Sequence, residues 1–158
     1  MRRRGHGDEN HVGILNALRG ALRKFQTARR DILVYQTPPL TDAIEVIGYP
    51  EVELFAASSA PDTDFFARLI DVAPDGQARD VANGMVRARY RNGLTKPAML
   101  TPGEVTKFSI RLVPTANRFL PGHRLRLDIT SSDFPNYDRN HNTAADPNFD
   151  AELDRKST

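Results

Sequence analysis

Cysteine and tryptophan are both absent from this sequence of 158 residues. Without cysteine, the chain forms no disulfide, holds no thiolate-bound metal and uses no cysteine nucleophile. Aromatic residues are also few, with eight Phe and four Tyr, so we expect no large aromatic binding platform. The lack of cysteine fits a reducing compartment, and we expect the protein to be cytoplasmic.

Long apolar runs are missing as well. A membrane-spanning helix needs about 18 or more apolar residues, and no stretch of the sequence approaches this length. The apolar run after the N-terminal arginines is short and is interrupted by Arg19 and Arg23, unlike a secretory signal. We therefore expect no membrane partner. The length corresponds to one domain with a core of its own.

The net charge of +2 conceals an uneven distribution of charge along the chain. Residues 1–30 hold eight Lys and Arg against Asp8 and Glu9, whereas the remainder holds 14 basic and 18 acidic residues. A nucleic-acid-binding surface requires basic residues clustered on the folded domain. Because the excess of positive charge lies in the leader, we expect no nucleic-acid partner.

Three segments follow from the sequence pattern. Residues 1–27 form a basic leader, in which a short amphipathic helix over about residues 12–26 places apolar residues on one face. Such a helix can lie on a membrane or in a partner's groove, but we interpret its stripe as packing on its own domain. Residues 28–147 form the main domain, and residues 148–158 form a frayed C-terminal tail.

The main domain changes to a period of two, which is typical of half-buried strands. In residues 85–91, for example, Val86, Ala88 and Tyr90 alternate with three arginines. Turn-forming pairs such as Asp75-Gly76 separate the expected strands, and no long helix intervenes. We predict an all-β fold, a β-sandwich of jelly-roll type, with strands at 32–35, 44–47, 52–57, 65–72, 85–91, 107–112 and 124–129.

Catalytic machinery is hard to find in this sequence. It has no Gly-x-Ser-x-Gly nucleophile turn, and two of its four histidines lie in the leader or beside it. A triad of Ser131 or Ser132 with Asp138 and His141 can be written down, but nothing in it supplies an oxyanion hole. We interpret these residues as solvated loop residues and predict no catalytic residue in the chain.

The same loop carries oxygen donors at alternate positions, as calcium-binding loops do. It lacks the central glycine and the glutamate of an EF-hand, and Asn and Asp also favour turns through hydrogen bonds to their own backbone. We favour the turn interpretation and expect neither a metal site nor a cofactor. The donors are Asp133, Asn136, Asp138, Asn140 and Asn142.

Two further groups could carry function. Asp62 and Asp64 precede an expected strand, where they could act as an acid/base pair or pin the strand's entry to the backbone. We favour the structural role. Arg87, Arg89 and Arg91 are predicted to form a cationic row on one sheet face, which would be solvated or would dock another domain.

The order of several short motifs resembles a known family, the C-terminal non-catalytic domain of the Xaa-Pro dipeptidyl-peptidase and cocaine esterase hydrolases. The resemblance covers about residues 28–143. Its motifs are Asp31-Ile-Leu-Val-Tyr35, Thr37-Pro-Pro-Leu40, Ser58-Ser-Ala-Pro-Asp-Thr-Asp-Phe65, Pro74-Asp-Gly76, Asn83-Gly-Met-Val-Arg-Ala-Arg-Tyr-Arg91, Pro102-Gly-Glu104, Pro121-Gly-His-Arg124 and Ser131-Ser-Asp-Phe-Pro-Asn-Tyr-Asp-Arg-Asn140.

The resemblance implies a jelly roll related to galactose-binding-like sandwiches. It also implies that a preceding α/β-hydrolase domain holds the serine, histidine and aspartate triad, while the jelly roll packs on that domain and helps to wall its substrate site. No triad position matches this chain, which we expect to be a fragment or split subunit of a serine hydrolase. Candidates for interdomain or substrate-wall contacts are Asp62, Asp64, Phe65, Arg87, Arg89, Phe134 and Tyr137.

Two further expectations concern partners. An apolar patch near Phe134 and Tyr137 would dock the hydrolase domain, and in the free chain it would allow self-association. The alternative is a free-standing carbohydrate- or ligand-binding module, because the fold hosts such modules. Sugar sites usually offer exposed aromatic residues, and tryptophan is absent, so we favour the hydrolase interpretation.

Overall fold

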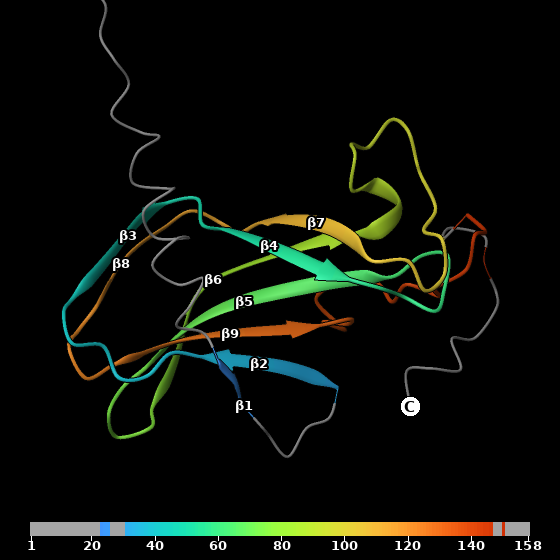
Figure 1. Ribbon diagram of the computed structural model, residues 1–158. Helices are drawn as coiled ribbons and strands as arrows, with labels where there is room; N and C mark the ends of the chain where they lie inside the picture. Colours follow the sequence, from blue (N-terminus) through green and yellow to red (C-terminus); the bar gives the residue numbers. More distant parts are fainter. Residues whose placement is uncertain (1–22, 26–30, 147–149, 151–158) are drawn as a thin grey trace, which may run out of the picture.

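The structure, a computed structural model, describes residues 23–25, 31–146 and 150. Nearly all of its regular structure is antiparallel β-sheet, arranged in two layers (Figure 1). Among the described residues, the single helical element is a short 3₁₀ helix, η1 (Ala88–Tyr90). The described residues therefore confirm the predicted all-β sandwich.

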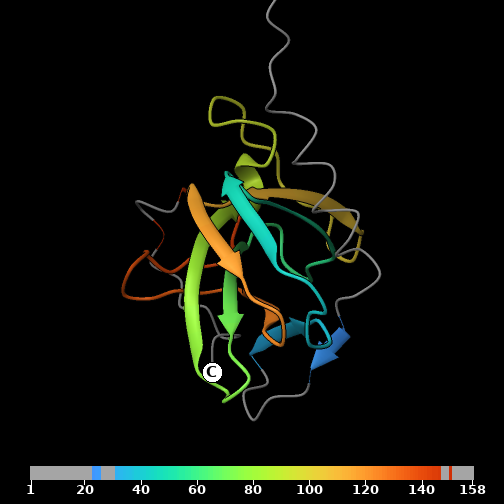
Figure 2. The ribbon, with the colours of Figure 1, turned by 90° about the vertical axis from the view of Figure 1, so that its left-hand side faces the viewer.

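One layer is a five-stranded sheet with the order β1-β2-β9-β5-β6. The other layer consists of two antiparallel pairs, β3 with β8 and β4 with β7, which lie on the far side of the core (Figures 1 and 2). The strands are β1 (Arg23–Phe25), β2 (Ile32–Gln36), β3 (Ile44–Gly48), β4 (Glu51–Ala56), β5 (Asp64–Val72), β6 (Ala78–Arg87), β7 (Thr106–Arg111), β8 (Thr115–Phe119) and β9 (Arg124–Thr130).

Alternation of apolar and polar residues explains most of these strands. In β7, Phe108 and Ile110 are buried, whereas Lys107 and Ser109, which alternate with them, are exposed. Side chains of successive strand residues point to opposite faces, so one face of each layer enters the core. The main core cluster contains Val46, Ala67, Leu69, Ala82, Ile110, Leu112, Phe119, Leu125 and Ile129.

The hairpin between β5 and β6 confirms the turn predicted at Asp75-Gly76. The amide of Gly76 donates to the carbonyl of Ala73 at 2.9 Å, and the carboxylate of Asp75 accepts from the amide of Gln77 at 2.9 Å. Gly76 has a φ of 90°, a conformation that glycine adopts without steric cost.

The two layers meet closely at Gly84 in β6. A Cβ atom at this position would lie 2.3 Å from the carbonyl oxygen of Arg111, which follows from the approach of β6 to the end of β7. The neighbouring carbonyl of Asn83 accepts a hydrogen bond of 2.8 Å from the amide of Val113. Glycine is required here for close backbone approach, not for an unusual φ.

Three expectations differ from the structure. Of the expected helix over residues 12–26, only residues 23–25 are described, and they form strand β1. Strand β6 begins at Ala78 and ends at Arg87, so the expected strand over 85–91 is wrong beyond residue 87. Strand β8 was not predicted. Its inward positions 115 and 117 hold the polar residues Thr115 and Asn117, whereas the inward positions of the predicted strands hold apolar residues.

Candidate functional site

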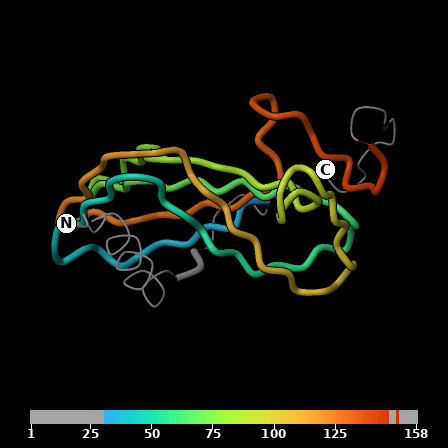
Figure 3. Tube along the Cα trace, turned by 90° about the horizontal axis from the view of Figure 1, so that it is seen from above, coloured from blue at the N-terminus to red at the C-terminus, as the bar shows by residue number. Residues whose placement is uncertain are grey.

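The longest irregular segments gather at one end of the sandwich, where β4, β6 and β9 finish and β5 begins. We call this the loop end and define it by residues 57–63, 88–105 and 131–146. The segment after η1 and the segment after β9 both lie at this end (Figures 1 and 3). All of the sequence-predicted site residues belong to the loop end or to the strand ends beside it.

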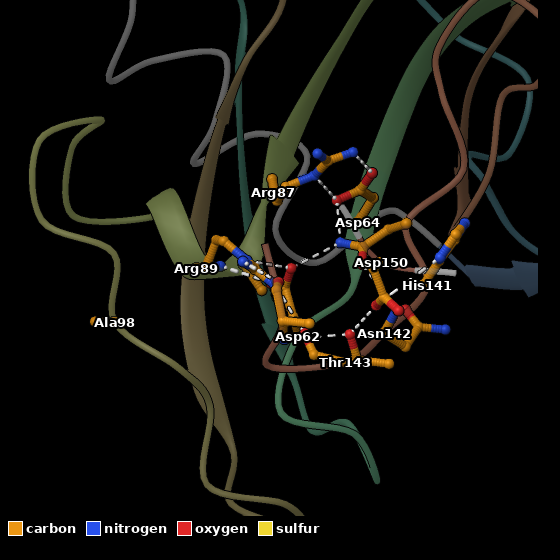
Figure 4. Close-up of polar contacts among 12 residues, drawn as sticks. Asp62, Asp64, Arg87, Arg89, Ala98, His141, Asn142, Thr143 and Asp150 are labelled. Atoms are coloured by element: carbon orange, nitrogen blue, oxygen red, sulfur yellow. Dashed lines mark hydrogen bonds and ion pairs between the residues drawn. The ribbon is translucent and has the colours of Figure 1, made fainter. Parts of the chain in front are cut away.

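Asp62 forms the centre of a buried polar cluster at the loop end (Figure 4). Its Oδ1 accepts a hydrogen bond from the backbone amide of Arg89 at 2.8 Å, and its Oδ2 accepts from Nε of the same residue at 2.7 Å. Asp62 is 0% exposed and Arg89 is 5% exposed. A buried charge of this kind is tolerated because it is paired and fully hydrogen-bonded.

Asp64 makes a second pair, with Arg87. Nε and Nη2 of Arg87 donate to the two carboxylate oxygens of Asp64, each at 2.9 Å. The hydrogen bond to Asp64, together with the charges of Asp64 and Asp62, raises the pKa of Arg87 above its ordinary value despite partial burial. This two-bond geometry is the one that arginine forms best with a carboxylate.

Asn140 joins the two pairs. Its Nδ2 donates to Oδ2 of Asp62 at 2.9 Å and to Oδ1 of Asp64 at 2.8 Å, while its Oδ1 accepts from the amide of Asn142 at 2.8 Å. Every carboxylate oxygen of Asp62 and Asp64 thus accepts at least one hydrogen bond from the chain itself. This saturation favours the structural role of the two aspartates over acid/base chemistry.

The arginines hold the irregular segments in place. Nη1 and Nη2 of Arg89 donate to the carbonyls of Ala145 and Thr143 at 2.8 and 2.7 Å. Arg91 donates in the same manner to the carbonyls of Ala88, at 2.9 Å, and Ala98. These side chains replace the backbone partners that a sheet would supply.

The predicted exposed arginine row is therefore wrong. The period of two ends at Arg87, because the chain turns into η1 at Ala88 and Arg89 no longer faces outward. Arg87 keeps a side chain that is 20% exposed, but its guanidinium is engaged by Asp64. The arginine and aspartate candidates for interdomain or substrate-wall contacts bind each other, and their contact with another domain stays a prediction.

The aromatic candidates separate into two kinds. Phe65 is half-buried and packs against Phe108, with ring centroids 4.8 Å apart, so it contributes to the core. Phe134 and Tyr137, in the loop after β9, are 59% and 42% exposed, as expected for the proposed patch. Tyr137 also contacts Phe66, with centroids 5.1 Å apart. The interdomain role of Phe134 and Tyr137 stays a prediction.

The triad that can be written from the sequence is not assembled. Ser131, Ser132 and Asp138 are exposed, and within the described residues no hydrogen bond or ion pair joins His141 to Asp138. Nδ1 of His141 lies 3.8 Å from Oδ2 of Asp150 instead. The geometry agrees with the interpretation of these serines as solvated loop residues.

Asp133 and Asn140, two of the possible calcium donors, make other contacts. Asp133 pairs with Arg68 at 3.3 Å, and its backbone carbonyl accepts from the amide of Asn136 at 2.9 Å, as in a turn. Asn140 is committed to the cluster. In the part of the chain that the structure describes, no group of three His, Asp or Glu residues is arranged to hold a metal ion.

Two polar features were missed by sequence reasoning. Asn140 is the residue that links Asp62 and Asp64, but it lies 78 residues from Asp62. No local sequence pattern predicts a contact over this separation. His123 lies at the opposite end of the sandwich, where its Nδ1 is 2.8 Å from Oδ1 of the buried Asp71.

No described helix is long and apolar enough to cross a membrane.

Comparison with known proteins identifies the family to which this sequence is similar. Residues 8–156 match the family described as the X-Pro dipeptidyl-peptidase C-terminal non-catalytic domain. The cocaine esterase of Rhodococcus sp. (strain MB1 Bresler) is 50% identical over 73% of this chain. A putative serine esterase of Mycobacterium tuberculosis (strain CDC 1551 / Oshkosh) is 34% identical over 70% of the chain. The chain spans 20% of the length of each of these relatives.

Solved structures with a similar fold are also hydrolytic enzymes by name. An aminopeptidase from a marine sediment archaeon (Thaumarchaeota archaeon) superposes with a TM-score of 0.72 at 36% identity, over 75% of this chain and 21% of the other. An α-amino acid ester hydrolase superposes with a TM-score of 0.71 at 32% identity, over 81% of this chain and 24% of the other.

Proposed function

The chain belongs to the family of X-Pro dipeptidyl-peptidase C-terminal non-catalytic domains, and from this premise we propose that it packs on an α/β-hydrolase domain and helps to wall the substrate site of that domain. The observation that carries the proposal is the exposed aromatic loop at the loop end, with Phe134 59% exposed on a chain that spans about a fifth of its relatives' length. Exposed apolar side chains held in a fixed conformation are typical of interaction surfaces.

The substrate class follows from the relatives. Those compared above are named as esterases, an aminopeptidase and an amino acid ester hydrolase. We infer that the complete enzyme cleaves small esters or aminoacyl compounds with a serine nucleophile on the hydrolase domain. This chain would supply no reacting group, because the carboxylates at its loop end are saturated by its own arginines and by Asn140.

The remaining assignments belong to the same proposal. We assign the sandwich to the jelly-roll type, related to galactose-binding-like domains, with a leader at 1–27, the main domain at 28–147 and a tail at 148–158. The leader contributes residues 23–25 to the sheet as β1. We place the protein in the cytoplasm without a nucleic-acid or membrane partner, and we expect the free chain to self-associate through the patch near Phe134 and Tyr137.

Co-expression tests the proposal. The chain is produced with the hydrolase portion of a family member that has been truncated before its own C-terminal domain, and copurification and turnover of a p-nitrophenyl ester are measured. We expect the two to copurify, the isolated chain to be inactive, and the truncated hydrolase to gain activity or thermal stability from the chain. The proposal would be contradicted if the isolated chain turned over the ester and lost this activity in Ser131→Ala or Ser132→Ala. It would also be contradicted if the chain and the truncated hydrolase did not copurify.

A further inference from the structure

A stacked cation and ring lie in the loop after β9. The guanidinium carbon of Arg139 lies 4.6 Å from the centroid of the Phe134 ring. Both residues are exposed. Arg139 has no carboxylate within ion-pair distance among the residues that the structure describes, unlike Arg68, Arg87, Arg89 and Arg126, which all have one.

This loop is held at three points. Asp133 pairs with Arg68 at 3.3 Å, the ring of Tyr137 rests on Phe66, and Asn140 is fixed by Asp62 and Asp64. The stacked pair is thus presented in a fixed position, which lowers the entropy that binding must remove. Fixed aromatic and arginine side chains are also the residue types that contribute most to protein interfaces.

We propose that Phe134 and Arg139 together anchor this domain on the α/β-hydrolase domain, and that the complementary surface is an apolar pocket with a carboxylate at its rim. The inference rests on the proposed function and deepens it by specifying the contact. Phe134 would enter the pocket, and the planar guanidinium of Arg139, already stacked, would pair with the carboxylate through two hydrogen bonds. Arg139 was not among the residues singled out from the sequence.

Binding of the full chain to the truncated hydrolase portion tests the inference, with wild type compared with Phe134→Ala, Arg139→Glu and Arg139→Gln. Arg118→Glu is the matched control, because Arg118 is also exposed but lies on β8 and pairs with Glu45 at 3.7 Å. We expect Phe134→Ala and Arg139→Glu each to weaken binding about tenfold or more, and the control to change it less than about twofold. Unchanged melting temperatures of the free variants would show that they fold.

Salt concentration separates the two contributions. The loss in Arg139→Gln should shrink between low and high salt, because an ion pair at the rim is screened, whereas the loss in Phe134→Ala should persist. If the wild type, Phe134→Ala and Arg139→Glu bind equally well, the inference is overturned and the proposed function stays intact. Absence of binding by the wild-type chain would instead remove the proposed function, and the inference with it.

Discussion

The two ends of the sandwich are built in different ways. At the end opposite the loop end, which we call the turn end, a hairpin turn at residues 73–77 closes within the sequence itself, and Gly76 and Asp75 satisfy the local backbone. At the loop end, residues 131–146 contain no strand or helix and are fixed by side chains from distant segments. The hairpin turn needs only local chemistry, whereas residues 131–146 depend on the buried charges of the Asp62 cluster.

This difference indicates that a few buried charged residues at the loop end contribute a large share of the stability of the domain. Removing one member of a buried ion pair costs far more than the pair contributes, because the remaining charge is left without compensation. A hairpin turn has no such vulnerability, since its bonds are to the backbone and are partly solvated. We therefore expect substitutions at the loop end to have larger effects than those at the turn end.

The largest effect is expected for Asp62→Ala. Arg89 would remain buried with no carboxylate partner, and losing one partner of a buried pair costs about 3–5 kcal/mol in the free energy of unfolding. Urea unfolding followed by circular dichroism measures this loss. The double variant Asp62→Ala/Arg89→Met should recover part of the stability, since it removes the orphaned charge. A loss no larger than that of a turn-end substitution would contradict the comparison.

A smaller effect is expected for Asp64→Ala. The guanidinium of Arg87 can reach water, but Asn140 would keep a buried donor without an acceptor, which costs on the order of 1–3 kcal/mol. Asp128→Ala is the matched control, because Asp128 also accepts two hydrogen bonds from one arginine, Arg126, at 2.7 and 2.8 Å, in a more exposed setting. Its expected loss is at most about 1 kcal/mol. Equal melting temperatures for the two variants would show that burial does not distinguish these pairs.

The smallest effect is expected for His123→Ala at the turn end. Asp71 would lose a hydrogen bond of 2.8 Å but would keep Arg79 at 3.5 Å, so the loss should be about 1 kcal/mol or less. Amide hydrogen exchange should increase near residues 71–77 and stay unchanged at residues 140–146. Faster exchange at the loop end would mean that the two ends are coupled through the sheet.

Sequence analysis predicted the strands whose inward positions are apolar and failed where that condition is broken. Strand β7 was found because Phe108 and Ile110 alternate with polar residues, and β8 was missed because Asn117 and Thr115 take the place of apolar residues. The alternation over residues 85–91 was misleading after Arg87, because a period of two does not reveal that the chain enters a 3₁₀ turn. Hydrogen bonds from the amide and side chain of Arg89 to the distant Asp62 hold the chain in this turn.

The candidate site was predicted in part. Asp62 and Asp64 were favoured as structural residues from their place at the head of a strand, and in the structure their carboxylates are buried and bind the chain's own arginines. Phe134 and Tyr137 were expected to be exposed, and both are. The partners of the two aspartates were not identified, since Asn140 is 78 and 76 residues away from them. Contacts over such separations follow from the packing of the strands and leave no trace in local composition.

The manner in which Arg89 holds residues 143 and 145 has a consequence for sequence variation. Its guanidinium binds the carbonyl oxygens of these residues, which every amino acid possesses, so the contact does not depend on which side chains occur there. Substitutions at Ala145 should be accepted freely, even by larger residues, because its side chain is exposed. The same segment can therefore diverge in sequence while keeping its path, provided that Arg89 and its carboxylate partner are retained.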